Sequence, residues 1–320
     1  MVLVSELRHD PVTGRQVLLA TGRAARPHTV PRPPPDPRAT ASCPFCPGHE
    51  AETPPEVART GDGEPGDPGW RVRAFPNLFP IVGGDAPGPG GTGLHEVVVL
   101  DPDHERDLAR LDDRATDELF SMLRARARAH AAHAHTQVLV NHGRAAGASI
   151  AHPHAQVVSV DLVPLQVADA LTRAAAADRD LVLADAEAAT AAGALVLDRP
   201  ARAWCPLASA SSYEVRVAAP GAGPRFADTT DDDLRSVGRT VRDVVAGITT
   251  LLGDVAYNVV VHSAPHAHAA PDARSHWYVV VVPRLATVAG FEFGTGLLVT
   301  TTDPTVAADR LRAALTGGTP

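Results

Sequence analysis

An internal repeat is the feature that most constrains how this chain folds. The first copy runs from "LHEVVVLDPDH" to "HPHAQVVSV", and the second runs from "SYEVRVAAPGAG" to "HWYVVVVPR". Each copy predicts the same order of elements: a strand, a helix, a strand, a loop and a final strand. The aligned pairs, at offsets that drift only from 118 to 124, are Glu96 with Glu214, Gln137 with Asn258, and His152 with His276. This order and spacing indicate gene duplication and two half-domains that share one sheet or face each other.

The flanking segments complete the predicted organisation. "RHDPVTGRQVLLATGRAARP" predicts a strand, a turn at residues 10–14 and a second strand, whereas residues 27–69, rich in Pro, Gly and acids, are expected to be irregular. The expected fold class is α+β, with a mainly antiparallel sheet flanked by helices. We expect an N-terminal half at residues 1–164, a helical connector at 165–200 and a C-terminal half at 201–320.

Composition excludes several classes of function. The net charge of -8 argues against nucleic-acid binding, and no apolar run approaches the roughly 18 residues that a membrane span needs. All 29 basic residues are arginine, which excludes a Schiff-base lysine and a Walker-type phosphate lysine. Three cysteines make no disulfide framework, and the N-terminus lacks a signal-peptide core, so we expect a cytoplasmic enzyme.

The motif "CPFC" holds Cys43 and Cys46 with two residues between them, and three interpretations of it are open. The pair is half of a tetrahedral zinc site, a redox dithiol, or two free surface cysteines. His104 of "DPDH" and His152 are the residues best placed to complete a zinc site. The second copy keeps only Cys205 and one histidine in the matching places, so we expect one structural zinc and not two.

The motif "HPHAQ" holds two histidines whose side chains point to the same face if the segment is a strand. His152 can then bind a metal while His154 faces a pocket; the alternative is a solvated loop. The preceding loop contains Asn141, Gly147 and Ser149, whose small residues let backbone N–H groups approach a phosphate closely.

Gln156 separates two kinds of phosphorus chemistry. A neutral histidine is a competent nucleophile toward phosphorus when its other ring nitrogen is held by an acceptor. A histidine at position 156 could act as a general acid in hydrolysis, whereas a glutamine only donates hydrogen bonds to phosphoryl oxygens. Because the second pKa of a phosphate is about 6, a phosphate leaving group needs little protonation. Glutamine therefore favours transfer between phosphates.

These motifs resemble those of the galactose-1-phosphate uridylyltransferase branch of the histidine-triad superfamily. The blocks "DPVTGRQVLLATGRAARP", "CPFCPG", "RAFPNLFP", "HEVVVLDPDH", "NHGRAAGASIAHPHAQ" and "GFEFGTG" match in order over nearly the whole chain. The resemblance implies duplicated histidine-triad-like half-domains and a ping-pong reaction in which His154 attacks the α-phosphorus of a nucleotide sugar. Gln156 and Ser149 would hold the transferred group. The implied zinc ligands are Cys43, Cys46, His104 and His152.

The resemblance also implies the substrate contacts and leaves the acceptor open. The implied contact residues are Arg23, Arg26, Asn77, Phe79, Asn141, Gly147, Phe291 and Glu292. Phe291 replaces a tyrosine of the well-known transferases, and valines follow "HW" where those enzymes have further histidines. In both departures the chain is similar to the branch that includes plant ADP-glucose phosphorylase.

The resemblance implies a sugar 1-phosphate as the first expected acceptor of the transferred group, with inorganic phosphate as the alternative. A third hypothesis for the function is a nucleotide-binding or hydrolytic protein that has no nucleotidyl-transfer activity. The family commonly forms dimers, which suggests a homodimer.

Overall fold

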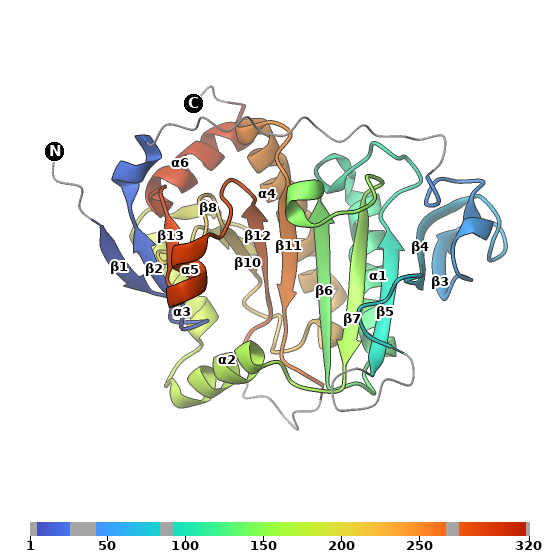
Figure 1. The fold of residues 1–320 in the computed structure, drawn as a ribbon, viewed down its shortest axis with the longest axis horizontal. Helices are drawn as coiled ribbons and strands as arrows, with labels where there is room; N and C mark the ends of the chain where they lie inside the picture. Colours follow the sequence, from blue (N-terminus) through green and yellow to red (C-terminus); the bar gives the residue numbers. More distant parts are fainter. Residues whose placement is uncertain (1–4, 26–42, 84–91, 267–274, 318–320) are drawn as a thin grey trace.

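The two copies of the repeat contribute strands to one ten-stranded sheet in the computed structural model (Figure 1). The structure describes residues 5–25, 43–83, 92–266 and 275–317. Neighbouring strands of this sheet are antiparallel. In order across the sheet they are β3 (Ala58–Gly61), β4 (Trp70–Pro76), β5 (Gly93–Val99), β7 (His154–Val160), β6 (His135–His142), β11 (Tyr257–His262), β12 (Tyr278–Pro283), β10 (Val215–Ala218), β9 (Arg202–Trp204) and β8 (Leu195–Leu197).

The two copies meet at the centre of this sheet, where β6 pairs with β11. The order β5, β7, β6 on one side is repeated in reverse as β11, β12, β10 on the other. Within the copies, Val138 pairs with Val157, and their counterparts Val259 and Val281 pair with each other. The α+β class with a mainly antiparallel sheet is confirmed, and of the two arrangements expected, the shared sheet is the one found. The boundaries at residues 164 and 200 stay a prediction.

The strand register corrects one pair of the sequence alignment. In the first half Val157 pairs with Glu96, whereas in the second half Val281 pairs with Val215. Glu96 therefore corresponds to Val215, at an offset of 119, and not to Glu214. A shift of one residue in a strand moves a side chain to the other face, so the two glutamates are not equivalent in position.

Helices cover one face of the sheet (Figure 1). α1 (Asp113–Ala129) contacts β4, β6 and β7, α4 (Asp231–Leu252) contacts β9, β10 and β12, and α6 (Pro304–Leu315) packs on α4. The two long helices begin at side-chain caps, where Asp112 accepts from Ala115 N and Thr230 accepts from Asp233 N. A Cβ at Gly238 of α4 would lie 2.8 Å from the Phe120 ring, so this glycine lets α1 and α4 pack closely.

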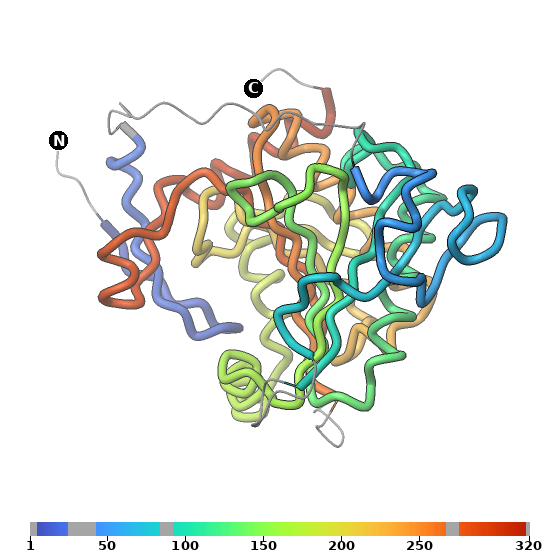
Figure 2. The backbone as a smooth tube through the Cα atoms, turned by 45° about the vertical axis from the view of Figure 1, so that its right-hand side comes forward, coloured from blue at the N-terminus to red at the C-terminus, as the bar shows by residue number. Residues whose placement is uncertain are grey.

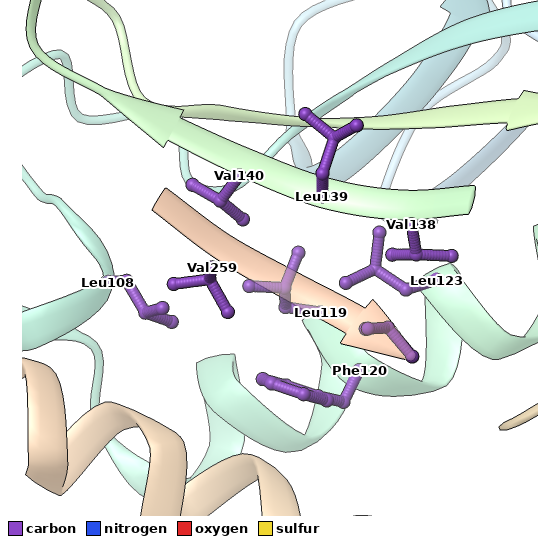
Figure 3. Close-up of a pocket in the computed structure, with 9 residues that line it drawn as sticks. Leu108, Leu119, Phe120, Leu123, Val138, Leu139, Val140 and Val259 are labelled. Atoms are coloured by element: carbon purple, nitrogen blue, oxygen red, sulfur yellow. The ribbon is translucent and has the colours of Figure 1, made fainter. Parts of the chain in front are cut away.

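A small cavity lies in the core between α1, β6 and β11 (Figure 3). Its lining is entirely aliphatic and aromatic, including Leu119, Phe120, Val138 and Val259. The volume of about 10 Å³ is that of a single water molecule at most. This space is a packing defect of the hydrophobic core, and a nucleotide does not fit in it.

The N-terminal strands form a second sheet of three strands with a C-terminal one. β1 (Glu6–His9) is antiparallel to β2 (Gln16–Leu19), which is parallel to β13 (Leu298–Thr300). The predicted turn between β1 and β2 is confirmed, and its Asp10 reaches a buried cluster formed by β10 of the second half and by the connector. There Arg216 binds the carboxylates of both Asp10 and Asp185. This ion cluster attaches the N-terminal turn to the ten-stranded sheet.

Two predictions of local structure were partly wrong. Within residues 43–69, expected to be irregular, Ala58–Gly61 forms the edge strand β3, because its backbone pairs with β4 although its sequence lacks an apolar pattern. The connector contains the helices α2 (Leu165–Ala176) and α3 (Leu181–Ala191), as expected, but ends in strand β8. β8 pairs with β9 and so forms the edge of the ten-stranded sheet on the side of the second half.

Candidate active site and metal centre

The two faces of β7 carry different chemistry. Ala155 and Val157 pack into the core beneath the helices. His154 and Gln156 point to the opposite face, because side chains alternate along a strand, and they lie across from Val99 and Val97 of β5. The sheet thus presents a histidine and a glutamine side by side on the face that α1 and α4 leave free.

Hydrogen bonding fixes the state of the His154 ring. Its Nδ1 lies 3.0 Å from the carbonyl oxygen of His152, which only accepts hydrogen bonds, so Nδ1 carries the ring proton. Burial lowers the pKa of His154 below its usual range, which keeps the ring neutral. Phe45 packs edge-on against this ring with 5.4 Å between centroids. The remaining nitrogen, Nε2, therefore carries a free lone pair, as a nucleophile needs.

Four side chains from three segments form a cluster that could hold a metal ion. Their ligand atoms all lie within 4.8 Å of one another, and the residues are Cys43, Cys46, His104 and His152. The sulfur-to-nitrogen distances are 3.3 Å from Cys46 to His104, 3.5 Å from Cys46 to His152, and 3.7 Å from Cys43 to His152. Tetrahedral zinc, with Zn–S of about 2.3 Å and Zn–N of about 2.0 Å, would separate such atoms by about 3.5 Å.

The protonation of this cluster also suits a metal. His152 Nε2 lies 2.8 Å from the carbonyl oxygen of Asp101, so Nε2 carries the proton and Nδ1 presents its lone pair to the sulfurs. Burial lowers the pKa of His152 to about 4, so the ring is neutral. Burial and the neighbouring Cys43 raise the pKa of Cys46 to about 11. A metal ion that binds here would have to displace the thiol protons.

Gln156 is held by a histidine of the neighbouring strand. Its Oε1 lies 2.8 Å from Nε2 of His95, a residue of β5 that is 6% exposed. Asn77, a predicted substrate contact, also reaches Nε2 of His95, at 3.2 Å, while its own Oδ1 accepts from the backbone N–H of Phe79. The Phe79 side chain is 82% exposed beside this group. The structure thus brings Asn77 and Gln156 together through His95.

The loop between β6 and β7 is held from the second half. Asn258 of β11 donates from Nδ2 to Asn141 Oδ1 at 2.7 Å and to the carbonyl oxygen of Ala146 at 2.9 Å. Gly147 follows with a φ of 94°, a left-handed conformation that favours glycine. Ser149 is exposed on the same loop. Asn141 lies beside the reactive strand, and its amide is oriented by Asn258.

Three of the other predicted contacts lie on short helices next to the strands of the three-stranded sheet. Arg23 is exposed on the short helix Thr21–Ala25 after β2, and Phe291 and Glu292 are on α5 (Gly290–Thr295) before β13. Figures 1 and 2 show this blue and red part of the chain apart from the green strand β7. Within one chain the structure therefore does not bring these residues to His154, and their role stays a prediction. Arg26 lies outside the described residues.

The sequence analysis missed two residues of the site, His95 and Asn258. His95 stands in "LHEVVV", where its position on the same face as Gln156 becomes visible only once β5 and β7 are paired. Asn258 keeps its place as the repeat counterpart of Gln137, and in the structure it also faces Asn141 across the junction of the halves. His276, the repeat counterpart of His152, contacts Asp180 and the carbonyl oxygen of Pro220 instead of a thiol.

Comparisons with known proteins find relatives that cover nearly the whole chain. The family model described as "Domain of unknown function (DUF4921)" matches residues 99–318. An ADP-glucose phosphorylase of Arabidopsis thaliana is 29% identical over 333 residues, covering 96% of this chain and 92% of the relative. The crystal structure of an ADP-glucose phosphorylase from Arabidopsis thaliana with bound ADP-glucose has a TM-score of 0.85 at 27% identity, covering 97% of this chain and 99% of that one.

A structure described as uridylyltransferase shares the fold, with a TM-score of 0.74 at 24% identity and coverage of 98% of this chain and 99% of that one. Within the described ranges, no helix combines the length and the hydropathy that are needed to span a bilayer.

Proposed function

Since this chain belongs to the DUF4921 family, and to the ADP-glucose phosphorylase-like branch of the galactose-1-phosphate uridylyltransferase family, we propose that His154 transfers the nucleoside monophosphate of a nucleotide sugar. The chain is an enzyme of the nucleotidyltransferase type. The observation that carries the proposal is the free Nε2 of a neutral, buried His154 beside the Gln156 amide.

In the first step His154 Nε2 attacks the α-phosphorus of the nucleotide sugar. A bond forms between Nε2 and phosphorus, the bond to the bridging oxygen breaks, and the sugar 1-phosphate leaves with the electron pair of that bond. The Nδ1 proton stays on the ring and is held by the carbonyl oxygen of His152, which stabilises the positive charge of the nucleotidyl-histidine. Gln156 donates to a phosphoryl oxygen as negative charge develops there.

In the second step an acceptor phosphate attacks the same phosphorus from solution and releases His154. We propose inorganic phosphate as the acceptor, because the relatives that cover this chain at 27% and 29% identity are ADP-glucose phosphorylases. A sugar 1-phosphate is the second candidate. Gln156 favours either phosphate over water as the acceptor, since its amide cannot take the proton that an attacking water must lose. With a second pKa of about 6, a sugar 1-phosphate is already mostly dianionic at neutral pH.

We propose zinc for the cluster of Cys43, Cys46, His104 and His152, because two thiols and two imidazoles at these separations are a zinc donor set. A bound zinc would fix the end of β7 and thereby the position of His154, two residues after the ligand His152. It would act as a structural ion and take no part in the bond-making steps.

Two further properties belong to this proposal. The predicted location is the cytoplasm, where nucleotide sugars and phosphate can reach the site. The predicted homodimer is tested by the mass of the protein in solution, measured by light scattering after size-exclusion chromatography; a monomer at micromolar concentration would contradict it.

A substrate matrix read by phosphorus NMR tests the function. ADP-, UDP- and GDP-glucose are each mixed with the protein and with phosphate, glucose 1-phosphate, galactose 1-phosphate or no acceptor. We expect ADP-glucose and phosphate to give ADP and glucose 1-phosphate fastest. Turnover only with a sugar 1-phosphate would support the second candidate. Release of a nucleoside monophosphate at the same rate without an acceptor would indicate a hydrolase and contradict transfer.

A further inference from the structure

The orientation of the Gln156 amide decides whether it helps or hinders the transfer. A side-chain amide has a donor end and an acceptor end of nearly the same shape. With Nε2 toward the phosphoryl group, Gln156 donates a hydrogen bond to it. With Oε1 in that place, a partly negative oxygen would face a negative phosphoryl oxygen. The protein therefore needs a contact that holds Oε1 away from the substrate.

We propose that His95 is a positioning residue that binds Oε1 of Gln156 and so directs the Nε2 hydrogens of the amide toward the transferred phosphoryl group. This inference rests on the proposed function of the site. The contact that carries it is the 2.8 Å distance between His95 Nε2 and Gln156 Oε1, across the pair of strands β5 and β7.

A backbone group sets the tautomer of His95. The N–H of Ile81 points to Nδ1 of His95 at 3.2 Å, and a main-chain N–H can only donate. Nδ1 must therefore be the bare nitrogen of the ring, and the proton of the neutral ring is on Nε2. His95 is 6% exposed, and burial lowers its pKa, which favours the neutral form. The Nε2 proton then requires an acceptor, and Oε1 of Gln156 is the acceptor in reach.

A second amide competes for the same nitrogen. Asn77 Nδ2 lies 3.2 Å from His95 Nε2, and it could donate there only if the ring proton were on Nδ1. That tautomer would set the Nδ1 proton against the Ile81 N–H and would force the Gln156 amide to turn over. The shorter contact to Gln156 and the fixed direction of the backbone donor both favour the proton on Nε2. Asn77 then keeps its Nδ2 hydrogens for another partner at the half-exposed edge of the site.

Removal of the imidazole frees the Gln156 amide to rotate. Loss of a complete oxyanion donor lowers the rate of a chemical step by about 100-fold or more, and Gln156→Ala sets that limit here. An amide that is present but unheld spends part of its time in the wrong orientation, so His95→Leu is expected to slow nucleotidyl transfer by about tenfold. The affinity for ADP-glucose should change by less than about threefold, since His95 acts through Gln156 and not on the substrate.

The experiment measures the rate of adduct formation on the full chain in a single turnover with ADP-glucose labelled in its α-phosphate. His95→Leu removes the donor, whereas His95→Gln places an amide N–H near the position of the imidazole Nε2. We expect His95→Gln to regain most of the wild-type rate. His133→Leu is the matched control, because this histidine binds Asp161 far from β7's reactive end and should leave the rate unchanged.

A double variant shows whether His95 acts through Gln156. In a Gln156→Ala background, His95→Leu should add less than about twofold, because the amide that it positions is gone. A tenfold loss in both backgrounds would overturn the inference, as would a wild-type rate in His95→Leu. A wild-type protein that forms no adduct would overturn the proposed function and this inference with it.

The tautomer is measurable without any variant. Nitrogen-15 chemical shifts of the His95 ring in the wild-type protein distinguish a proton on Nε2 from one on Nδ1. We expect the Nε2–H form. A ring with its proton on Nδ1 would bind Asn77 instead of holding Oε1 of Gln156, and it would overturn the inference whatever the variants do.

Discussion

Arg216→Met is expected to destabilise the protein by about 3 to 5 kcal/mol, because it leaves buried carboxylates without their counterion. The side chain of Arg216 is 2% exposed, and those of its partners Asp10 and Asp185 are 3% and 5% exposed. Arg216 Nη1 donates to both partners, at 3.1 Å and 2.9 Å. At an effective dielectric constant of about 20, two charges about 4 Å apart attract each other by about 4 kcal/mol, which agrees with that range.

Urea unfolding at about pH 7, followed by circular dichroism, measures this loss. Arg114→Met is the matched control: Arg114 pairs with Glu118 on the surface of α1, where its side chain is 69% exposed, and the variant should lose less than about 0.5 kcal/mol. Adding Asp10→Asn and Asp185→Asn to Arg216→Met should restore part of the stability, because the two carboxylates that Arg216 hydrogen-bonds are then replaced by neutral amides. A loss below about 1 kcal/mol in Arg216→Met would refute the view that this cluster attaches the N-terminal turn.

Three further changes test other parts of the structure. Cys43→Ser should lower the zinc affinity at least about tenfold, measured by elemental analysis after dialysis against a weak chelator. Asp180→Asn should cost about 1 kcal/mol at about pH 5.5 and less at about pH 9. His276 is paired with Asp180, its folded-state pKa is raised, and stability from such a group is present below its unfolded pKa and lost as the pH rises through the folded value. Asn258→Ala leaves Asn141 Oδ1 without its donor and should raise the KM for the nucleotide sugar about fivefold, measured by steady-state kinetics.

Each of these outcomes has a control or a contradicting result. Cys205→Ser should keep its zinc, because Cys205 is buried directly after the end of β9 and is not part of the cluster. Equal loss of zinc from both variants would contradict the assigned ligands. A pH-independent cost of Asp180→Asn would show that His276 is uncharged when folded. A wild-type KM in Asn258→Ala would show that the loop is held without it.

The sequence predicted those parts of the site that depend on local pattern. Alternation along "HPHAQ" placed His154 and Gln156 on one face, and the pattern of two cysteines and two histidines corresponds to the cluster that could hold a metal. Both depend on residues close in sequence or on ligand chemistry. The shared fold of the two halves was also visible, because duplicated strands keep their hydrophobic pattern.

What the sequence could not give were contacts that depend on strand register. The position of His95 beside Gln156 requires the exact pairing of β5 with β7, and a change of one residue would turn His95 to the other face. The same sensitivity explains why Glu96 was aligned with Glu214 instead of Val215. Asn258 reaches Asn141 only through the junction of β6 and β11, which nothing in the local sequence specifies.

The most direct test of the central claim is mass spectrometry of the protein after brief reaction with ADP-glucose. We predict one acid-labile adenosine monophosphate group on the peptide that contains His154, its absence in His154→Ala, and its discharge as ADP when phosphate is added. No adduct on the wild-type protein with any nucleotide sugar, or an undiminished adduct on His154→Ala, would contradict nucleotidyl transfer through His154.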